Sequence, residues 1–265
     1  MTSGLKAHHQ EAIEKLVSTY QNDPAFPALI IGGSVAKGCA RDDSDVDFLI
    51  VAHDKEYNER KARGDLFINR ADLSNYPGGY VDGKIINERY LHEVADKGNE
   101  PSRAAFDGAF LGYSRLDGLE EVINNIAVYP ESGHEERLKS FYCMAFMQHW
   151  LMTEADRHDN LYAKTRAASQ LALYAGRLIL AHNRVLYPYH KWLLHYLGKC
   201  VEKPMGLLRN IDSLLQNPNL QNTRTLFRSL QDFKDWGVTD LEAYTWFMEE
   251  VEWSWMSGTT PLEDL

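Results

Sequence analysis

The chain has 265 residues, with 28 Lys and Arg against 38 Asp and Glu, and a formal net charge of −10. This acidic balance disfavours a general nucleic-acid-binding protein, which normally carries a basic surface, and no stretch approaches the roughly 18–20 apolar residues of a membrane-spanning helix. No apolar core of a secretory signal is found near the N-terminus, and Cys39, Cys143 and Cys200 have no metal-binding spacing. We therefore expect a cytoplasmic protein.

The first 130 residues alternate predicted helices and strands. Apolar residues at helical spacing predict a helix over 5–21, which Asp23-Pro24 ends. Short apolar runs predict strands at 28–31, 45–51, 80–86 and 110–114, and helices are expected at 54–63 and, after Gly118, up to Ile126. This alternation indicates an α/β or α+β domain.

The pattern changes near Tyr129-Pro130, where long helical periodicities begin. We expect helices near 135–158, 160–186, 189–201, 204–216, 221–235 and 239–256. They predict a helical bundle, and therefore two domains at 1–130 and 131–265. The tryptophans of the last helix, Trp246, Trp253 and Trp255, are expected to pack in the core rather than to stack on bases or to form a dimer seam.

One segment carries the strongest chemical signal. A Gly-Ser turn, Gly33-Ser34, follows the first predicted strand, and Asp45 and Asp47 open the second. Residues two apart in a strand point to the same face, so the two carboxylates are expected to lie side by side. A divalent metal ion, usually Mg²⁺, relieves their repulsion, because it prefers carboxylate and phosphate oxygens. The segment therefore predicts a metal-assisted phosphate site.

Residues around the turn are candidates for binding phosphate. Gly33 has no Cβ, so phosphate oxygens can approach its backbone, and the Ser34 hydroxyl can donate a hydrogen bond. A helix starting at Val35 would add its positive end. Lys37 and Arg41 are candidates to neutralise a triphosphate.

This arrangement resembles the nucleotidyltransferase superfamily, which shares its catalytic core with polymerase beta. The family signature is an apolar strand, a Gly-Ser turn and an Asp-x-Asp pair before a second apolar strand, and Ser44 matches the serine that often precedes the pair. The family commonly has Ala-Arg-Gly after the turn, whereas this chain has Ala36-Lys37-Gly38, and lysine lacks the bidentate fork of arginine. The resemblance is strong over about 30–55, and it implies an α+β fold: a mixed sheet flanked by helices, followed by an α-helical bundle.

The resemblance also implies the chemistry. Family members carry a third carboxylate on a later strand, for which we choose Asp82. Alternatively, Asp82 and the glycine after it form a hairpin turn, and then Asp65 or Asp72 would be the candidate. Two Mg²⁺ ions held by the three carboxylates would assist attack of an acceptor hydroxyl on the α-phosphorus of a nucleoside triphosphate, with pyrophosphate leaving. Lys37 and Ser34 would hold the β- and γ-phosphates, and ATP is the commonest donor in such small two-domain members.

The acceptor hydroxyl needs a base. In aminoglycoside adenylyltransferases a helical domain supplies a Glu for this purpose, and Glu154, late in the predicted helix 135–158, is the closest analogue. The alternative for Glu154 is an ordinary solvated helix face. The 131–265 domain would then bind the acceptor.

The resemblance implies a small hydroxylated acceptor, of which aminoglycoside and lincosamide antibiotics are the best-known examples. A polycationic aminoglycoside would suit the net charge of −10. The alternatives are nucleotidylation of a protein acceptor and a nucleotide-binding regulatory module without turnover. Whether the protein is a monomer or a homodimer stays open.

Polar and aromatic residues within the helical part offer further candidates. Asn183, Tyr187 and Lys191 would form a wall of the acceptor or nucleobase site. Alternatively, the segment is an inter-helix turn whose aromatic residues pack the bundle, with His182 hydrogen-bonded inside.

Overall fold

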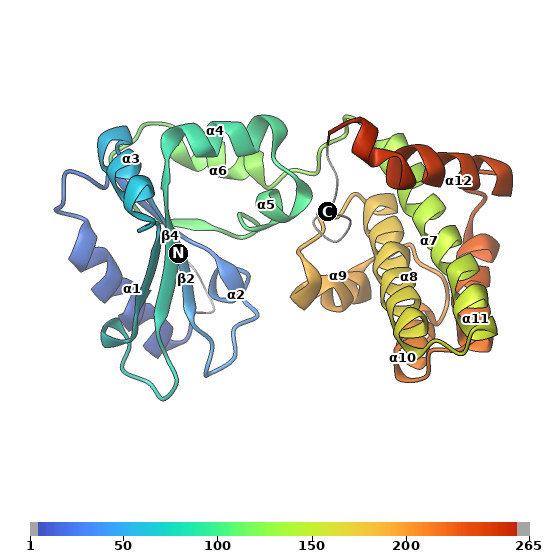
Figure 1. Cartoon of the computed structure of the whole chain (residues 1–265). Coiled ribbons are helices and arrows are strands. Elements are labelled where there is room, and N and C mark those ends of the chain that lie inside the picture. Colours follow the sequence, from blue (N-terminus) through green and yellow to red (C-terminus); the bar gives the residue numbers. More distant parts are fainter. Residues whose placement is uncertain (1–4, 259–265) are drawn as a thin grey trace. The chain divides into compact units, whose positions relative to one another are not determined.

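A computed structural model describes residues 5–258. The chain divides into two compact units, Met1–Val128, here called the N-terminal unit, and Tyr129–Leu265, here called the helical unit. Figure 1 labels most of the helices of both units. Across the described part of the chain, no helix combines the length and the apolar character that crossing a membrane requires.

The N-terminal unit is built on a five-stranded mixed sheet with strand order β3-β4-β2-β1-β5. Strands β2 and β4 pair in parallel, and the other neighbours are antiparallel. The α+β prediction, a mixed sheet followed by a helical region, is confirmed. The strands are β1 (Ala28–Ile31), β2 (Val46–Ala52), β3 (Phe67–Arg70), β4 (Val81–Asn87) and β5 (Phe110–Ser114).

Among residues 5–128, the α-helices that accompany this sheet are α1 (Ala7–Tyr20), α2 (Gly33–Ala36), α3 (Asp54–Arg63), α4 (Glu88–Lys97), α5 (Glu100–Ala104) and α6 (Leu119–Ile126). Side chains alternate along β2, so Phe48 and Ile50 pack with Leu16 of α1 on one face. On the other face, Val51 packs with residues of α4 and α6 such as Leu91. Figure 1 shows α4 and α6 beside one another.

The two helices α4 and α6 cover this second face at the end of β2 and β4 where Val51 and Ile86 are buried. At the other end, Asp47 and Leu49 of β2 are half-buried and Lys84 of β4 is exposed. One end of the sheet face is therefore accessible, and it is the end where the predicted aspartates lie.

Several predicted elements match the structure in type and bounds, namely the strands at 28–31 and 110–114 and the helix at 54–63. The predicted strand 80–86 is β4, so Asp82 and the following Gly83 lie inside a strand, and the hairpin-turn alternative is wrong. Strand β3 and helices α4 and α5 were not predicted.

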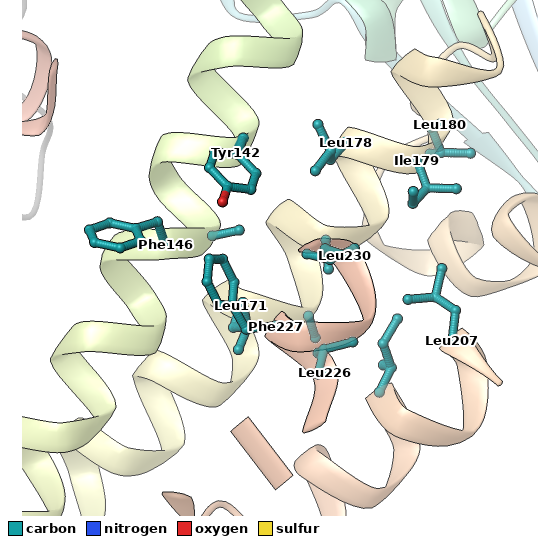
Figure 2. Close-up of a cluster of buried hydrophobic side chains, with 14 of the residues drawn as sticks. Tyr142, Phe146, Leu171, Leu178, Ile179, Leu180, Leu207, Leu226, Phe227 and Leu230 are labelled. Atoms are coloured by element: carbon teal, nitrogen blue, oxygen red, sulfur yellow. The ribbon is translucent and has the colours of Figure 1, made fainter. Parts of the chain in front are cut away.

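Within its described residues, 129–258, the helical unit contains six α-helices: α7 (His134–Arg157), α8 (Leu161–His182), α9 (Leu193–Lys199), α10 (Leu207–Gln216), α11 (Leu220–Phe233) and α12 (Asp240–Phe247). Figure 2 shows how α7, α8, α10 and α11 enclose one apolar core. Tyr142 and Phe146 come from α7, Leu178 from α8 and Phe227 from α11. Because burying one such side chain contributes about 1.5–3 kcal/mol, this core is a main source of the unit's stability.

Three expectations for the helical unit are wrong, two about helix bounds and one about the tryptophans near the C-terminus. The predicted helix 189–201 begins only at Leu193, because Tyr189 has a φ of 71° and a short 3-10 turn follows it. In the predicted helix 239–256, the α-helical part ends at Phe247 and a π-helical turn follows. Trp246 packs against the core as expected, whereas Trp253 and Trp255 are exposed.

Candidate active site

Three carboxylates meet at the accessible end of the sheet. Asp47 and Asp82 are direct partners in the parallel register of β2 and β4, and Asp45 immediately precedes β2. Each of the three offers one carboxylate oxygen, and these oxygens all lie within 4.8 Å of one another. The structure thus brings together the three residues that were predicted as metal ligands.

The charge of this cluster affects its members. The pKa of Asp82 is raised, first by burial and then by the negative charge of Asp45, while the ammonium of Lys84 acts in the opposite direction. Tyr80 immediately precedes β4, and the negative charge of Asp45 is the largest cause of its raised pKa. Both shifts include a contribution in the direction that the negative charge of a neighbouring carboxylate produces.

Gly33 lies directly against this cluster. Its φ is 64°, a left-handed conformation that favours glycine. A Cβ at Gly33 would lie 1.7 Å from Oδ2 of Asp47, so the space of a side chain is taken by that carboxylate. The Gly32 amide also donates to the Asp47 carbonyl at 3.0 Å. The glycine turn after β1 thus helps to fix the position of Asp47.

The loop before Asp45 is held by two other elements. The Ser44 carbonyl accepts a hydrogen bond from the Tyr76 hydroxyl at 2.7 Å, and it lies 3.0 Å from Nε2 of His9 on α1. The Ser44 hydroxyl accepts from the Arg41 amide at 2.9 Å. Ser44, predicted to bind the nucleotide, thus lies in a loop contact that positions Asp45.

The remaining predicted nucleotide-binding residues lie in different surroundings. Ser34 is buried in α2, which is a single helical turn. Lys37 directly follows α2, and the Nζ of Lys37 donates a hydrogen bond to the Ala104 carbonyl at 3.0 Å. Arg41 is exposed, and its Nε lies 3.1 Å from Oδ1 of Asp43. Of these three, Lys37 alone lines the pocket beside the aspartates.

That pocket has a volume of about 290 Å³ and includes Gly33, Asp47 and Asp82 in its lining. The pocket is also lined by Phe67 of β3 and Lys84 of β4, which were not predicted from the sequence. Phe67 was missed because its strand was not predicted. Lys84 lies two residues after Asp82 and so on the same face of β4, which is the signal that could have identified it.

Glu154, the predicted base, lies on α7 in the helical unit. Its side chain is 30% exposed and carries an ion pair with Arg157 at 3.0 Å. It lines a pocket of about 580 Å³, together with Gln148, Tyr162 and Arg166 among others. The Gln148 side chain is almost fully buried, and its Oε1 has no hydrogen-bond partner among the described residues. Glu154 is thus a partly exposed carboxylate on the wall of a pocket lined by both polar and apolar residues.

The segment after α8 follows the packing alternative. Tyr187 is buried, and the Asn183 side chain donates to the carbonyls of Ile179 and Glu202. His182 Nε2 lies 2.8 Å from a Glu202 carboxylate oxygen. These contacts close an inter-helix turn, as expected if the segment packs the bundle.

The carboxylate cluster fits a divalent cation by its donor chemistry. Asp45, Asp47 and Asp82 supply hard oxygen ligands that are already close together, which would be electrostatically unfavourable for three carboxylates without a positive charge. Lys84 and Lys37 are the cationic side chains that line the pocket. The site can therefore bring a cation and a phosphate into contact.

Comparison with known proteins identifies the domain that carries this site. Residues 21–94 match the model of the nucleotidyltransferase domain family, and this segment includes Gly33 and the three aspartates. Among solved structures, the chain is similar to a nucleotidyltransferase-like protein from Exiguobacterium sibiricum, with 11% identity, a TM-score of 0.47, and coverage of 97% of this chain and 83% of that one. None of the curated proteins matches the chain. Residues 21–94, which carry the three aspartates and the Gly33 turn, are therefore similar to the nucleotidyltransferase domain family.

Proposed function

We propose that the protein is a metal-dependent enzyme that transfers a nucleoside monophosphate, AMP from ATP, to a hydroxyl group of a small acceptor. The observation that carries this proposal is the cluster of Asp45, Asp47 and Asp82 beside the Gly33 turn, in a nucleotidyltransferase domain. Pyrophosphate is the second product.

The reaction balances as a displacement at phosphorus. The acceptor oxygen forms a bond to the α-phosphorus, and the bond from that phosphorus to the α,β-bridging oxygen breaks. Pyrophosphate leaves with the bonding electrons, and the hydroxyl proton passes to a base. Bound Mg²⁺, two ions in this proposal, would supply positive charge to the attacking and leaving oxygens.

The residues of the N-terminal unit hold the donor in this scheme. Asp45, Asp47 and Asp82 hold the metal ions, and Gly33 leaves room for the Asp47 carboxylate. Lys37, on the pocket wall, supplies positive charge to the phosphates.

We assign acceptor binding to the helical domain, residues 131–265, and the proton-accepting role to Glu154. The position of Glu154 on the wall of a 580 Å³ pocket supports this assignment, because a base must be accessible to a substrate hydroxyl. A carboxylate also attracts the ammonium groups of an aminoglycoside. Aminoglycosides and lincosamides are therefore the first acceptors to test.

The test uses the purified full-length protein with Mg²⁺, each of the four nucleoside triphosphates labelled at the α-phosphate, and a panel of hydroxylated acceptors. We expect pyrophosphate release and transfer of the α-label to a small molecule, with ATP as the preferred donor.

Three results would contradict the proposal. Label that appears in a polypeptide would indicate a protein acceptor. Nucleotide binding without pyrophosphate release from any acceptor would indicate a regulatory module without turnover. Undiminished transfer after removal of divalent ions with EDTA would exclude metal dependence.

A further inference from the structure

The accessible face of the sheet carries two rows of side chains that run across the strands. In the pairing register, Asn69 of β3, Asp82 of β4 and Asp47 of β2 are successive partners and form the first row. Residues that are partners across a sheet share a face, so these side chains lie side by side. The first row contains two of the three clustered carboxylates.

The second row lies two residues further along β4. Its members are Phe67 of β3, Lys84 of β4 and Leu49 of β2, again successive partners in the register. Two residues along a strand correspond to about 7 Å, which is roughly the span of the ribose between a phosphate and its base. All three residues line the same 290 Å³ pocket as Asp47 and Asp82.

Phe67 is 57% exposed although it is a large aromatic residue. A single exposed apolar residue is common on protein surfaces and by itself indicates no function. Phe67 differs because its ring lies on the face of the carboxylate cluster and on the pocket wall. An aromatic ring in such a place offers a stacking surface to any nucleobase.

Lys84 is the cross-strand partner of Phe67 and lies on the same face of β4 as Asp82. Its side chain is exposed, so its ammonium can reach an anion in the pocket without a large desolvation cost. Cation and ring are thus adjacent on one face, with the carboxylate cluster in the neighbouring row.

We propose that Phe67 and Lys84 form the nucleotide-recognition surface of this site, with the donor's base stacked on Phe67 and a phosphate oxygen bound by Lys84. This inference rests on the proposed function, because it takes a nucleoside triphosphate as the donor. It adds a residue that binds the base, Phe67, and a further phosphate-binding residue, Lys84, which neither the motif nor the family match supplies.

The experiment measures equilibrium dissociation constants in the presence of Mg²⁺ for two probes. The first is α,β-methylene ATP, whose α,β bridge is not cleaved, and the second is inorganic tripolyphosphate, which has no base. The full-length protein is compared with Phe67→Ala, Phe67→Leu, Phe67→Trp and Lys84→Ala. Arg70→Ala is the control for disturbance of β3, because Arg70 lies on the opposite face of that strand and contacts Asp72.

We expect Phe67→Ala and Phe67→Leu to weaken binding of the ATP analogue by about tenfold, the range of base stacking on an aromatic ring. Phe67→Trp retains binding, because it keeps the ring. None of the three Phe67 variants changes tripolyphosphate binding, whereas Lys84→Ala weakens binding of both probes. Arg70→Ala changes neither.

Equal analogue binding by the unsubstituted protein and Phe67→Ala would overturn the recognition surface while leaving the proposed function intact. The same holds if Phe67→Ala raises the KM of the acceptor and leaves analogue binding unchanged, since Phe67 would then contact the acceptor. Failure of the unsubstituted protein to bind the ATP analogue with Mg²⁺ would instead overturn the proposed function itself.

Discussion

The carboxylate of Asp47 occupies the space in which a side chain on Gly33 would begin. A Cβ at Gly33 would lie 1.7 Å from Oδ2 of Asp47 and 2.4 Å from its carboxyl carbon. The glycine of the turn and the second aspartate of the acidic pair therefore depend on one another, although the rest of α2 and the loop before β2 separate them along the chain.

We predict that Gly33→Ala lowers kcat/KM by about a hundredfold or more, because a displacement of about 1 Å in a catalytic group has that effect. The variant should also lose about 1 kcal/mol of unfolding free energy, since alanine is strained at a φ of 64°. Pyrophosphate release and thermal unfolding measure the two effects.

The matched control is Gly38→Ala. Gly38 has nearly the same φ, 67°, but nothing lies within 4 Å of its Cβ position. It should show the loss of stability with little loss of activity. If both variants lose activity equally, backbone strain rather than the Asp47 contact would account for the effect.

The second prediction concerns the carboxylate cluster. Asp45→Asn, Asp47→Asn and Asp82→Asn each remove one charge while keeping the side-chain shape, and each should reduce pyrophosphate release at least about a hundredfold, since even groups behind metal ligands contribute 10–100-fold. The control is Asp43→Asn, which removes an exposed carboxylate nearby and should retain activity. Normal rates in Asp45→Asn or Asp47→Asn would show that the metal-ligand assignment is wrong.

The third prediction concerns the base. Glu154→Gln should lower turnover by about a hundredfold or more while the Kd for nucleotide stays unchanged, because a base acts on the acceptor hydroxyl and not on the donor. Single-turnover rates and nucleotide titrations separate the two quantities. Glu136→Gln, at the other end of α7, is the control. Unchanged turnover in Glu154→Gln would exclude the role.

The fourth prediction concerns pH and the loop before Asp45. His9 is buried, and burial, followed by the positive neighbours His8 and Lys6, lowers its pKa, whereas the Ser44 carbonyl and Asp42 act in the opposite direction. The folded state thus binds a proton on His9 less readily than the unfolded chain. Unfolding is favoured as the pH falls through the unfolded value of about 6.5 and on towards the lowered folded value.

Thermal unfolding between pH 7.5 and pH 5.5 measures this dependence. The Tm of the unsubstituted protein should fall more steeply with acidification than that of His9→Gln, which keeps a donor near the Ser44 carbonyl and cannot titrate. Identical slopes would mean that His9 contributes no proton linkage in this range.

Local sequence patterns predict those helices and strands whose ends are marked by a proline or a glycine. The strand at 28–31 is a short apolar run after Pro27, and the helix at 54–63 ends before Gly64, which has a φ of 71°. Strand β3 escaped prediction because Phe67 and Asn69 are both exposed, so the strand lacks a buried side that would produce a recognisable alternation.

The residues of the candidate site likewise fall into those that local sequence predicts and those that depend on long-range strand pairing. Asp45 and Asp47 share a face by strand geometry alone, so their pairing could be predicted from spacing. The place of Asp82 depends on the parallel register of β2 and β4, a long-range pairing that local sequence does not specify. Lys84 depends on that same register, and its local signal is its position two residues after Asp82, on the same face of β4. Arg41 was chosen for its charge, but its guanidinium pairs with Asp43.

Parallel pairing of β2 and β4 also has a consequence for folding. Parallel neighbours need a crossover, and here residues 53–80, with α3, β3 and a short turn, must be in place before Asp82 reaches Asp47. Contacts of this kind form slowly, because loop closure costs entropy before pairing repays it. The carboxylate cluster therefore forms only late in the folding of the domain. Binding of a luminescent lanthanide ion to the cluster should accordingly follow the last folding phase.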